Sequence, residues 1–480
     1  MWKSNLLCVF LITRLSSVFV VQTWFVPDEY WQSLEVSHRL SFGYGYLTWE
    51  WLEGIRSLIY PLFFCIPYKL LAYFSLDDPK ALIYVPRILQ ALFSAWSEWS
   101  FIKEIGKLCD KSQVSWFVLL QLGNYFLYYV TSRTLANTLE MGCTLLGISY
   151  FLKQHTDSFF LFVIISCYMR PTSAPIWLPF MLCFLQQKKT HIFTRHYLKI
   201  YMKCLVILAA VFGFDSWWYG KVTLVPLQFL LFNIVNDFSK FYGEHSWHWY
   251  FTNALPSLMG PSLIPLILSF SSKTALSFTE NRFLTVQLSV VLYILCHSLV
   301  GHKEIRFLTP IIPLLNLLAA LKLPNLRWQR IFLVLFCVWN IPIMLYLSTR
   351  HQRGVLDATD FLRSMITSED RVLFLMPCHS TPLYSHLHVK AELQFLTCPP
   401  NLNHLKNYVD EADKFYDNPT DWFIDNPSSS FTNYLVFFDV LLDSISAHLG
   451  SNGFLLIGNF FHADIAQGRV GRRVLVFKKG

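Results

Sequence analysis

Two adjacent carboxylic acids, Asp28 and Glu29, follow the first apolar stretch of the chain, in segment 27–32 of sequence PDEYWQ. A carboxylate partly removed from water gains affinity for protons and can act as a general base. We therefore predict Asp28 and Glu29 as catalytic residues, with Trp31 and Gln32 contacting the substrate. Proline followed by acids also starts helices, and this capping role is compatible with catalysis.

A second aromatic segment, residues 43–51 of sequence GYGYLTWEW, follows soon after the acidic pair. Tryptophan and tyrosine are enriched where a protein meets the membrane surface. Aromatic rings beside an acid are also how proteins hold sugar rings. Trp49 and Glu50 are therefore candidate substrate-binding residues, and interface anchoring remains the alternative.

The third candidate, residues 301–307 of sequence GHKEIRF, is basic. His302, Lys303 and Arg306 place three potentially cationic side chains within five positions. Fixed cations stabilise the charge that develops on a leaving phosphate, so this segment predicts a phosphate-binding site. Long basic side chains that reach from apolar surroundings toward water are the alternative.

Polar side chains also lie at the heads of two apolar stretches. Arg133, Asn137 and Glu140 occupy one head, and Arg170 the other. Ionisable groups at such depths usually have partners and a function. We expect Arg133 and Arg170 to bind substrate.

The segment 242–250 carries two histidines three positions apart, His245 and His248. No third ligand has matching spacing, so we expect substrate contact by His248 rather than a metal site. Cys378 and Cys398 lie in the polar C-terminal part, where an oxidising compartment would allow a disulfide. From the residues alone, that pairing stays open.

The composition places these residues in a membrane protein. Of 480 residues, 54% are hydrophobic and only 15% are charged, against roughly a quarter charged in soluble domains. The net charge of +8 is spread over short segments between apolar runs. This pattern orients a chain in a bilayer and argues against a nucleic-acid partner.

A spanning helix needs about 20 mainly apolar residues, and eleven stretches are candidates, several of them short. Their ranges are 6–25, 82–102, 114–130, 135–152, 159–168, 174–185, 205–218, 251–270, 284–300, 307–321 and 331–347. Stretch 57–76 is ambiguous. If it is an interfacial or re-entrant helix, the densest Lys/Arg loops fall on the cytosolic side, as the positive-inside tendency requires.

This topology puts the chemistry-bearing segments on the lumenal side. We expect a transmembrane catalytic domain over residues 1–347, with a first lumenal loop at 27–80 that contains interfacial helices. Residues 348–480 are expected to form a small lumenal α/β domain. Its strands are predicted at 371–376, 434–438 and 473–477, from β-branched and aromatic content.

Segments 27–32, 45–51, 133–140 and 302–307 together resemble the dolichyl-phosphate-mannose-dependent mannosyltransferases of the glycosyltransferase 22 family. The resemblance implies an α-helical polytopic membrane protein with a GT-C-type glycosyltransferase fold. It continues, through segments resembling the branch that builds glycosylphosphatidylinositol (GPI) anchors, over nearly the whole chain. These are 351–354 (HQRG), 377–382 (PCHSTP), 398–400 (CPP) and 410–413 (DEAD).

Two positions depart from the family pattern. Val26 stands where many members have histidine, and Ser246 stands where close relatives often have proline. The first departure suggests that this histidine is not essential to the chemistry. The second affects only local loop geometry.

The resemblance implies transfer of the third mannose, in α-1,2 linkage, from dolichyl-phosphate-mannose to the second mannose of a GPI precursor. The site would lie in the lumen of the endoplasmic reticulum, within membrane lipid. Asp28 would be the base of an inverting reaction, with Glu29 supporting it. His302, Lys303 and Arg306 would hold the dolichyl phosphate, so neither a metal nor another cofactor is expected.

Two alternatives remain at this point. A related α-mannosyltransferase of N-glycan assembly would share the N-terminal segments but not the C-terminal ones. A non-catalytic lipid transporter would favour paired inverted halves or broken helices, and the sequence shows no such symmetry.

Overall fold

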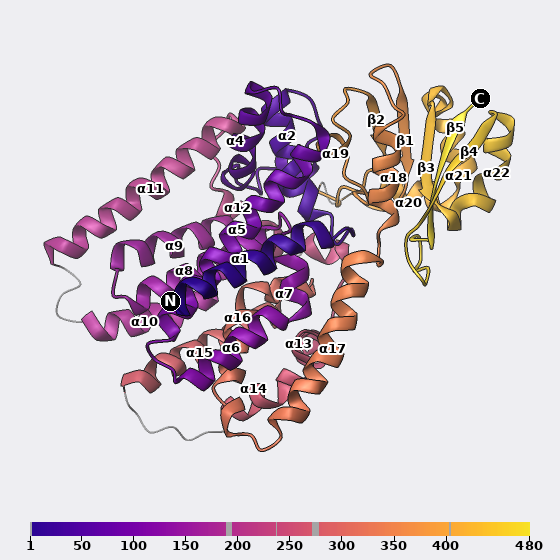
Figure 1. Cartoon of the computed structure of the whole chain (residues 1–480). Helices are drawn as coiled ribbons and strands as arrows, with labels where there is room; N and C mark the ends of the chain where they lie inside the picture. The colour runs from indigo at the N-terminus through magenta and orange to yellow at the C-terminus, as the bar shows by residue number, and fades with distance from the viewer. Residues whose placement is uncertain (1, 189–193, 237, 271–277, 403–404) are drawn as a thin grey trace. The chain divides into compact units, whose positions relative to one another are not determined.

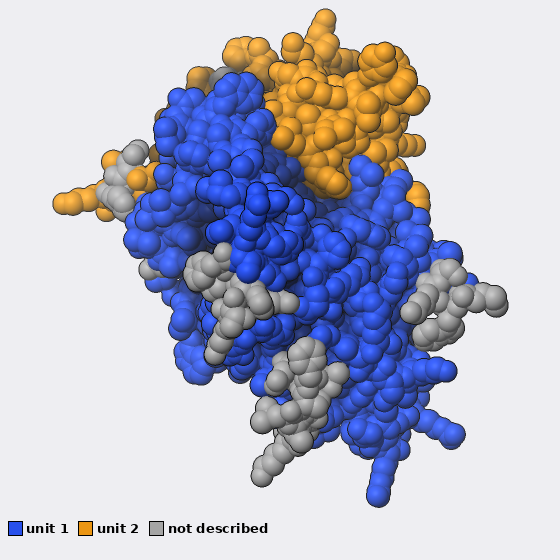
Figure 2. All heavy atoms as spheres, turned by 90° about the vertical axis from the view of Figure 1, so that its left-hand side faces the viewer, with its two compact units in different colours: residues 1–18, 53–60, 87–344 blue, residues 19–52, 61–86, 345–480 orange. Residues whose placement is uncertain are grey.

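The computed structural model of the chain describes residues 2–188, 194–236, 238–270, 278–402 and 405–480, most of them in helices (Figure 1). Contacts within the chain divide it into two compact units. Unit 1 comprises residues 1–18, 53–60 and 87–344, and unit 2 comprises 19–52, 61–86 and 345–480 (Figure 2). Unit 2 therefore combines part of the first loop with the C-terminal region.

A helix forms in each of the eleven apolar stretches. In chain order the helices of these stretches are α1 Trp2–Val20, α5 Pro79–Ile105, α6 Lys111–Gly123, α7 Tyr125–Val130, α8 Ala136–Leu152, α9 Thr156–Met169, α10 Ala174–Lys188, α11 Arg195–Tyr219, α13 Leu255–Met259, α14 Leu263–Phe270, α15 Phe278–Leu299, α16 Ile312–Ala320 and α17 Gln329–Thr349.

Five helical segments in the described part of the chain are long and apolar enough to cross a membrane. They are Arg195–Tyr219, Tyr250–Phe270, Arg282–Leu299, Ile305–Asn325 and Gln329–Arg363. Shorter apolar helices cover Asn5–Val20, Ile59–Tyr73, Thr156–Met169 and Val225–Val235. The multi-pass character expected from hydropathy is therefore present, while the number of eleven spans stays a prediction.

Two helical features differ from expectation. Stretch 114–130 is broken at Asn124, whose side-chain oxygen accepts hydrogen bonds from the backbone N–H groups of Phe126 and Leu127. Asparagine competes in this way with helical hydrogen bonding, so α7 starts afresh. Helix α12, Val225–Leu230, lies between the predicted spans 205–218 and 251–270, where no helix was predicted. Its apolar run was too short for a sequence-based assignment.

The first loop contains α2 Glu35–Phe42, α3 Trp49–Leu52 and α4 Ile59–Tyr73. Helix α4 has 15 residues with Pro67 inside. At 1.5 Å per residue it is about 22 Å long, short of the roughly 30 Å hydrocarbon core. That length agrees with an interfacial or re-entrant placement.

The C-terminal region contains a five-stranded sheet of order β2-β1-β3-β5-β4. The strands are β1 Arg371–Leu375, β2 Glu392–Phe395, β3 Tyr434–Phe438, β4 Phe454–Phe461 and β5 Arg473–Lys479. Strand β1 pairs in parallel with β2 and β3, whereas β5 pairs antiparallel with β3 and β4. The three predicted strands are confirmed, and β2 and β4 were missed.

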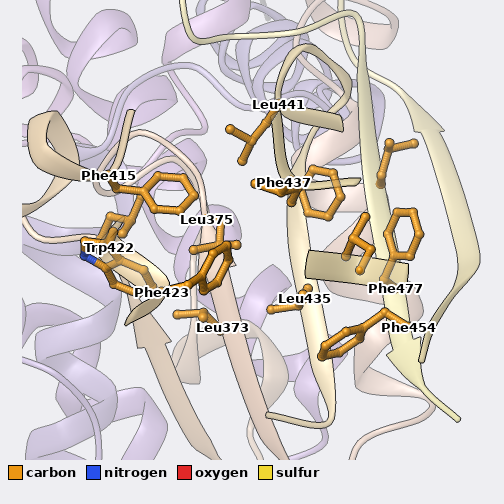
Figure 3. Close-up of a cluster of buried hydrophobic side chains, with 14 of the residues drawn as sticks. Leu373, Leu375, Phe415, Trp422, Phe423, Leu435, Phe437, Leu441, Phe454 and Phe477 are labelled. Atoms are coloured by element: carbon orange, nitrogen blue, oxygen red, sulfur yellow. The ribbon is translucent and has the colours of Figure 1, made fainter. Parts of the chain in front are cut away.

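Helices cover the sheet as its alternating pattern requires. Residues at alternate positions of β1, β3 and β5 pack with α20 Glu411–Asp417, α21 Pro419–Asp425 and α22 Leu442–Ser451 to form one hydrophobic core (Figure 3). The intervening strand residues Val372, Phe374, Val436 and Val476 are also buried. Helix α18, Gly354–Arg363, packs against β4 and β5. The C-terminal region is thus a small α/β domain, as expected.

Candidate active site

The acidic pair lies at the start of a helix in unit 2. The Pro27 carbonyl accepts hydrogen bonds from the N–H groups of Tyr30 and Trp31, both at 3.0 Å. The helix continues through a π-helical turn, Tyr30–Leu34, into α2. Asp28 is half-buried and Glu29 is buried. The expected helix start is present, and π-turns of this kind occur frequently at functional sites.

The two aromatic segments of the first loop are joined. The Gln32 amide donates a hydrogen bond to the Glu50 carboxylate at 3.1 Å. The Trp51 indole N–H donates to the backbone carbonyl of Trp31 at 3.2 Å. Trp49 and Glu50 begin the short helix α3. Segments 27–32 and 43–51 therefore form one structural feature, although the sequence presented them as separate candidates.

A histidine from the C-terminal region lies beside the acidic pair within unit 2. The His379 ring is 4.7 Å from the Trp31 ring, and the Trp31 indole N–H donates to the Thr381 carbonyl at 3.2 Å. Burial lowers the pKa of His379 to about 4, and the Asp28 carboxylate opposes that shift. His379 is therefore neutral at neutral pH and close enough to Asp28 to interact electrostatically.

A buried carboxylate that sequence reasoning missed fixes α2 in place. The Oε1 atom of Glu35 accepts hydrogen bonds from the Leu383 N–H at 2.8 Å and from the Ser385 N–H and hydroxyl at 3.1 and 2.6 Å. Burial raises the pKa of Glu35. In the sequence, Glu35 is one of several acids in a segment that is also rich in aromatic residues, so nothing distinguished it.

In unit 1, Arg170 and Glu140 form a buried ion pair, so Arg170 has a partner, which the sequence did not identify. The Arg170 Nε atom lies 3.0 Å from a Glu140 carboxylate oxygen, and its Nη1 donates to the Asn137 side chain at 3.2 Å. The Ser173 hydroxyl donates to the other oxygen of Glu140. A pair of buried charges needs this kind of additional hydrogen bonding to be tolerated.

The basic segment 301–307 is organised around its single acid, Glu304. Arg306 donates to both Glu304 oxygens, at 2.5 and 2.6 Å. The His302 ring is 3.0 Å from Glu304 through Nε2 and 3.0 Å from the Gly243 carbonyl through Nδ1. Both ring nitrogens face acceptors, an arrangement that favours the doubly protonated imidazolium form of His302. Burial works against that charge, but Glu304 outweighs it and raises the pKa of His302.

In unit 1, an aromatic ring connects Arg170 with Arg306. The guanidinium carbons of Arg170 and Arg306 lie 5.3 and 5.2 Å from the centre of the Phe307 ring. The Tyr293 hydroxyl donates to the Phe307 carbonyl at 2.7 Å. Cations at these distances are attracted to an aromatic face. The arginines therefore belong to one cluster, consisting of Asn137, Glu140, Arg170, Ser173, Glu304, Arg306 and Phe307.

Lys303 has a different environment from its two basic neighbours. Its ammonium group donates to the backbone carbonyls of His245, Val300 and Gly301, at 2.9, 2.5 and 3.4 Å. An ammonium has three protons, and three carbonyls receive them here. In this arrangement Lys303 ties the loop to segment 243–250 rather than presenting its charge beside Arg306.

Two further predicted substrate contacts have local partners. The buried Arg133 donates to the Tyr129 carbonyl at 3.1 Å, and its guanidinium lies 4.1 Å from the Tyr129 ring centre. His248 is exposed, with Nδ1 3.3 Å from the Thr252 hydroxyl. Substrate contact by Arg133 and His248 stays a prediction.

Among the described residues, one group of side chains has the spacing of a metal site: Cys378, His379 and Cys398, with donor atoms within 4.8 Å of one another. The two cysteines are joined as a disulfide with their Cα atoms 5.9 Å apart. A metal takes cysteine as a thiolate, so in this oxidised state only the imidazole of His379 is offered. The disulfide between Cys378 and Cys398, which the sequence alone did not decide, is therefore present.

Residues 5–388 match the Alg9-like mannosyltransferase family. The chain belongs to this family. A relative from Drosophila melanogaster named GPI mannosyltransferase 3 is 38% identical over 488 residues, covering 96% of this chain and 85% of that protein. The Homo sapiens GPI alpha-1,2-mannosyltransferase 3 is 35% identical, covering 99% and 87%. The similarity of this Alg9-like chain to these relatives thus includes its C-terminal domain.

Solved structures place the Alg9-like chain in the GT-C fold class, as predicted. ArnT from Cupriavidus metallidurans, bound to undecaprenyl phosphate, superposes with a TM-score of 0.65 at 10% identity and covers 99% of this chain and 98% of its own. The Archaeoglobus fulgidus oligosaccharyltransferase superposes with a TM-score of 0.54 at 12% identity, covering 97% and 74%. At these identities the likeness concerns the fold alone.

Proposed function

We propose that the protein transfers the third mannose of the GPI anchor, in α-1,2 linkage, from dolichyl-phosphate-mannose to the second mannose of the precursor. The observation that carries this proposal is the similarity to a protein named GPI mannosyltransferase 3 over 96% of the chain and to one named GPI alpha-1,2-mannosyltransferase 3 over 99%. The proposed location is the endoplasmic-reticulum membrane, with the chemistry on the lumenal side.

Asp28 is the proposed general base. The acceptor hydroxyl oxygen attacks C1 of the donor mannose as Asp28 takes the hydroxyl proton. The bond between C1 and the phosphate oxygen breaks, and dolichyl phosphate leaves with its electron pair. Attack opposite to a β-linked phosphate gives the α product by inversion. The proximity of neutral His379 to Asp28 supports this role, because the imidazole places no positive charge beside the carboxyl group.

The donor phosphate is assigned to Arg306 and the His302 imidazolium, which Glu304 holds in fixed positions. Preorganised cations stabilise a leaving phosphate without needing to move during the reaction. Lys303 is given an indirect role, since its ammonium holds the loop through three carbonyls. Contacts to the sugars are proposed for Glu29, Trp31, Gln32, Trp49, Glu50, Arg133, Arg170 and His248.

The decisive experiment supplies microsomes containing this protein with radiolabelled dolichyl-phosphate-mannose and a two-mannose GPI precursor. A three-mannose product that is sensitive to an α-1,2-mannosidase is expected. Asp28→Asn should abolish that product while the protein remains folded in the membrane, and Glu53→Gln, an exposed acid of the same loop, should leave it unchanged. Restored transfer by Asp28→Asn would remove Asp28 as the base. Labelling of N-glycan precursors instead would favour the related enzyme class.

A further inference from the structure

Unit 2 contains a cavity of about 240 Å³ outside the contacts described so far. It lies between the first loop and the α/β domain, with Tyr46 from the former and Phe395, Glu411, Trp422 and Asn426 from the latter. All of these residues belong to unit 2. Concave sites with aromatic walls and a few convergent polar groups are where proteins bind small molecules.

Aromatic rings form one side of this cavity. The Tyr46 and Phe395 rings are 4.8 Å apart with an angle of 79° between them, and Tyr46 remains 37% exposed. The same two rings contact Trp31, at 6.0 and 5.0 Å. The cavity therefore adjoins the helix start that carries Asp28, through shared aromatic contacts.

Polar residues with unused hydrogen-bonding capacity also line the cavity. Oε2 of Glu411 accepts from the N–H and hydroxyl of Thr397, at 3.0 and 2.6 Å, while no described residue donates to Oε1. Asn426 donates through its amide nitrogen to the Trp422 carbonyl at 2.8 Å, and within the described residues its amide oxygen has no donor.

Two further donors complete the set. The indole N–H of Trp422 and the hydroxyl of Tyr46 make no hydrogen bond with any residue that the structure describes. Trp422 packs its ring on the core beside Phe415 and Phe423, and Figure 3 shows its nitrogen at the outer side of that cluster. Burial and the Glu411 carboxylate raise the pKa of Tyr46, so its hydroxyl keeps its proton.

This combination matches the chemistry of a sugar ring. A pyranose has apolar C–H faces that pack on aromatic rings, and hydroxyls that both donate and accept. Glu411 Oε1 and Asn426 Oδ1 accept, whereas Trp422 and Tyr46 donate. An anion would meet the Glu411 charge at close range, and a lipid tail would leave these polar groups unpaired.

We propose that this cavity binds a hexose ring of the glycolipid acceptor. The inference rests on the proposed function, which supplies a mannose-containing acceptor, and it extends the site to residues that the first loop alone does not provide. A glycan held here would share aromatic contacts with Trp31. Tyr46, Glu411, Trp422 and Asn426 are accordingly specificity-determining residues rather than catalytic ones.

The test compares two cavity variants, Tyr46→Ala and Glu411→Gln, in the full-length protein. Matched controls are Phe431→Ala, an exposed ring of unit 2 that does not line the cavity, and Glu369→Gln, an exposed acid of the same unit. Transfer is measured against acceptor and donor concentration separately. The cavity variants should raise the acceptor KM about tenfold and leave donor KM and kcat within about twofold. The controls should match the wild type.

A second measurement does not depend on turnover. Saturation-transfer NMR with methyl α-mannopyranoside on the detergent-solubilised chain should give a signal that both cavity variants lose and both controls keep. If the wild type binds this sugar but transfers no mannose, the proposed function fails while the cavity assignment stands. If the wild type transfers mannose and the cavity variants keep both acceptor KM and sugar binding, the cavity assignment is overturned. A rise in donor KM alone also overturns it.

Discussion

Arg306 and Glu304 form a two-point ion pair, with Nε 2.6 Å from one carboxylate oxygen and Nη2 2.5 Å from the other. Burial acts to raise the pKa of Glu304, but the Arg306 guanidinium outweighs it and the pKa is lowered. The pair is therefore charged at neutral pH. Its geometry fixes the orientation of the Arg306 guanidinium plane.

Arg306→Lys should raise the donor KM about tenfold, because lysine keeps the charge but cannot form a two-point fork with Glu304. Initial rates of mannose transfer at limiting dolichyl-phosphate-mannose provide the measurement. Arg330→Lys is the matched control, since Arg330 is exposed in the same unit. An unchanged donor KM in Arg306→Lys would contradict the assignment of Arg306 to the donor phosphate.

Donor binding should also depend on pH through His302. Its pKa is raised above the ordinary value of about 6.5, so the ion pair with Glu304 is complete below pH 6.5 and is lost as pH rises through the higher folded-state value. The donor KM should therefore be constant at low pH and increase as pH rises through the folded-state pKa of His302. A phosphodiester donor has no proton to lose in this range.

His302→Asn is the comparison for that pH profile. Asparagine can keep one hydrogen bond but cannot become a cation, so the donor KM should be raised at low pH and should no longer change with pH. Donor KM measured between pH 6 and 9 in the wild type and in His302→Asn shows whether His302 causes the pH dependence. Parallel profiles in His302→Asn and the wild type would assign the pH dependence to another group.

Helix positions were largely predictable because hydrophobicity alone decides which segments enter lipid. Strands β1 and β3 were predictable for a similar reason, since every residue of β3 is buried. Strand β2 has four residues with no fully buried position, and β4 is interrupted by Gly458 and Asn459. The sequences of β2 and β4 therefore cannot be told from loops, and these segments become strands because neighbouring strands pair with them.

The candidate residues were predictable by type, whereas their partners were not. Arg170 was suspected from its depth, and a buried cation requires a nearby acid, which proved to be Glu140. The contact between Trp31 and Thr381 joins residues 350 positions apart. Contacts of that range arise from tertiary packing and leave no periodic signal. The backbone carbonyls that accept hydrogen bonds from Lys303 could not be predicted either, because every residue has such a carbonyl.

Arg170→Gln should lower the free energy of unfolding by about 3–5 kcal/mol, since it leaves the Glu140 charge buried without its cation. The double variant Arg170→Gln with Glu140→Gln should be clearly more stable than the single one, because it removes both charges. Thermal unfolding of the purified protein in detergent measures both. Lys203→Gln, which breaks an exposed pair with Asp157, should cost about 0–1 kcal/mol. A double variant as unstable as the single one would contradict this account.

The Cys378–Cys398 disulfide closes a loop of 20 residues between the ends of β1 and β2. A cross-link of that loop length contributes about 3 kcal/mol by restricting the unfolded chain. Replacing both cysteines by serine should therefore destabilise the α/β domain by roughly that amount. It should also loosen His379, which directly follows Cys378 and packs on Trp31.

Thiol-specific labelling with and without reductant, combined with thermal unfolding, tests the disulfide. The wild type should gain two labelled cysteines and lose stability on reduction, whereas the double serine variant should show neither change. Cys109→Ser, which removes a free thiol, is the control and should behave as the wild type.

Because His379 lies beside Asp28, reduction should also lower kcat while leaving the donor KM unchanged, since Arg306 is not held by this loop. Full labelling of Cys378 and Cys398 in the unreduced protein would show that the cross-link does not form, and the coupling to His379 would then have to come from packing alone.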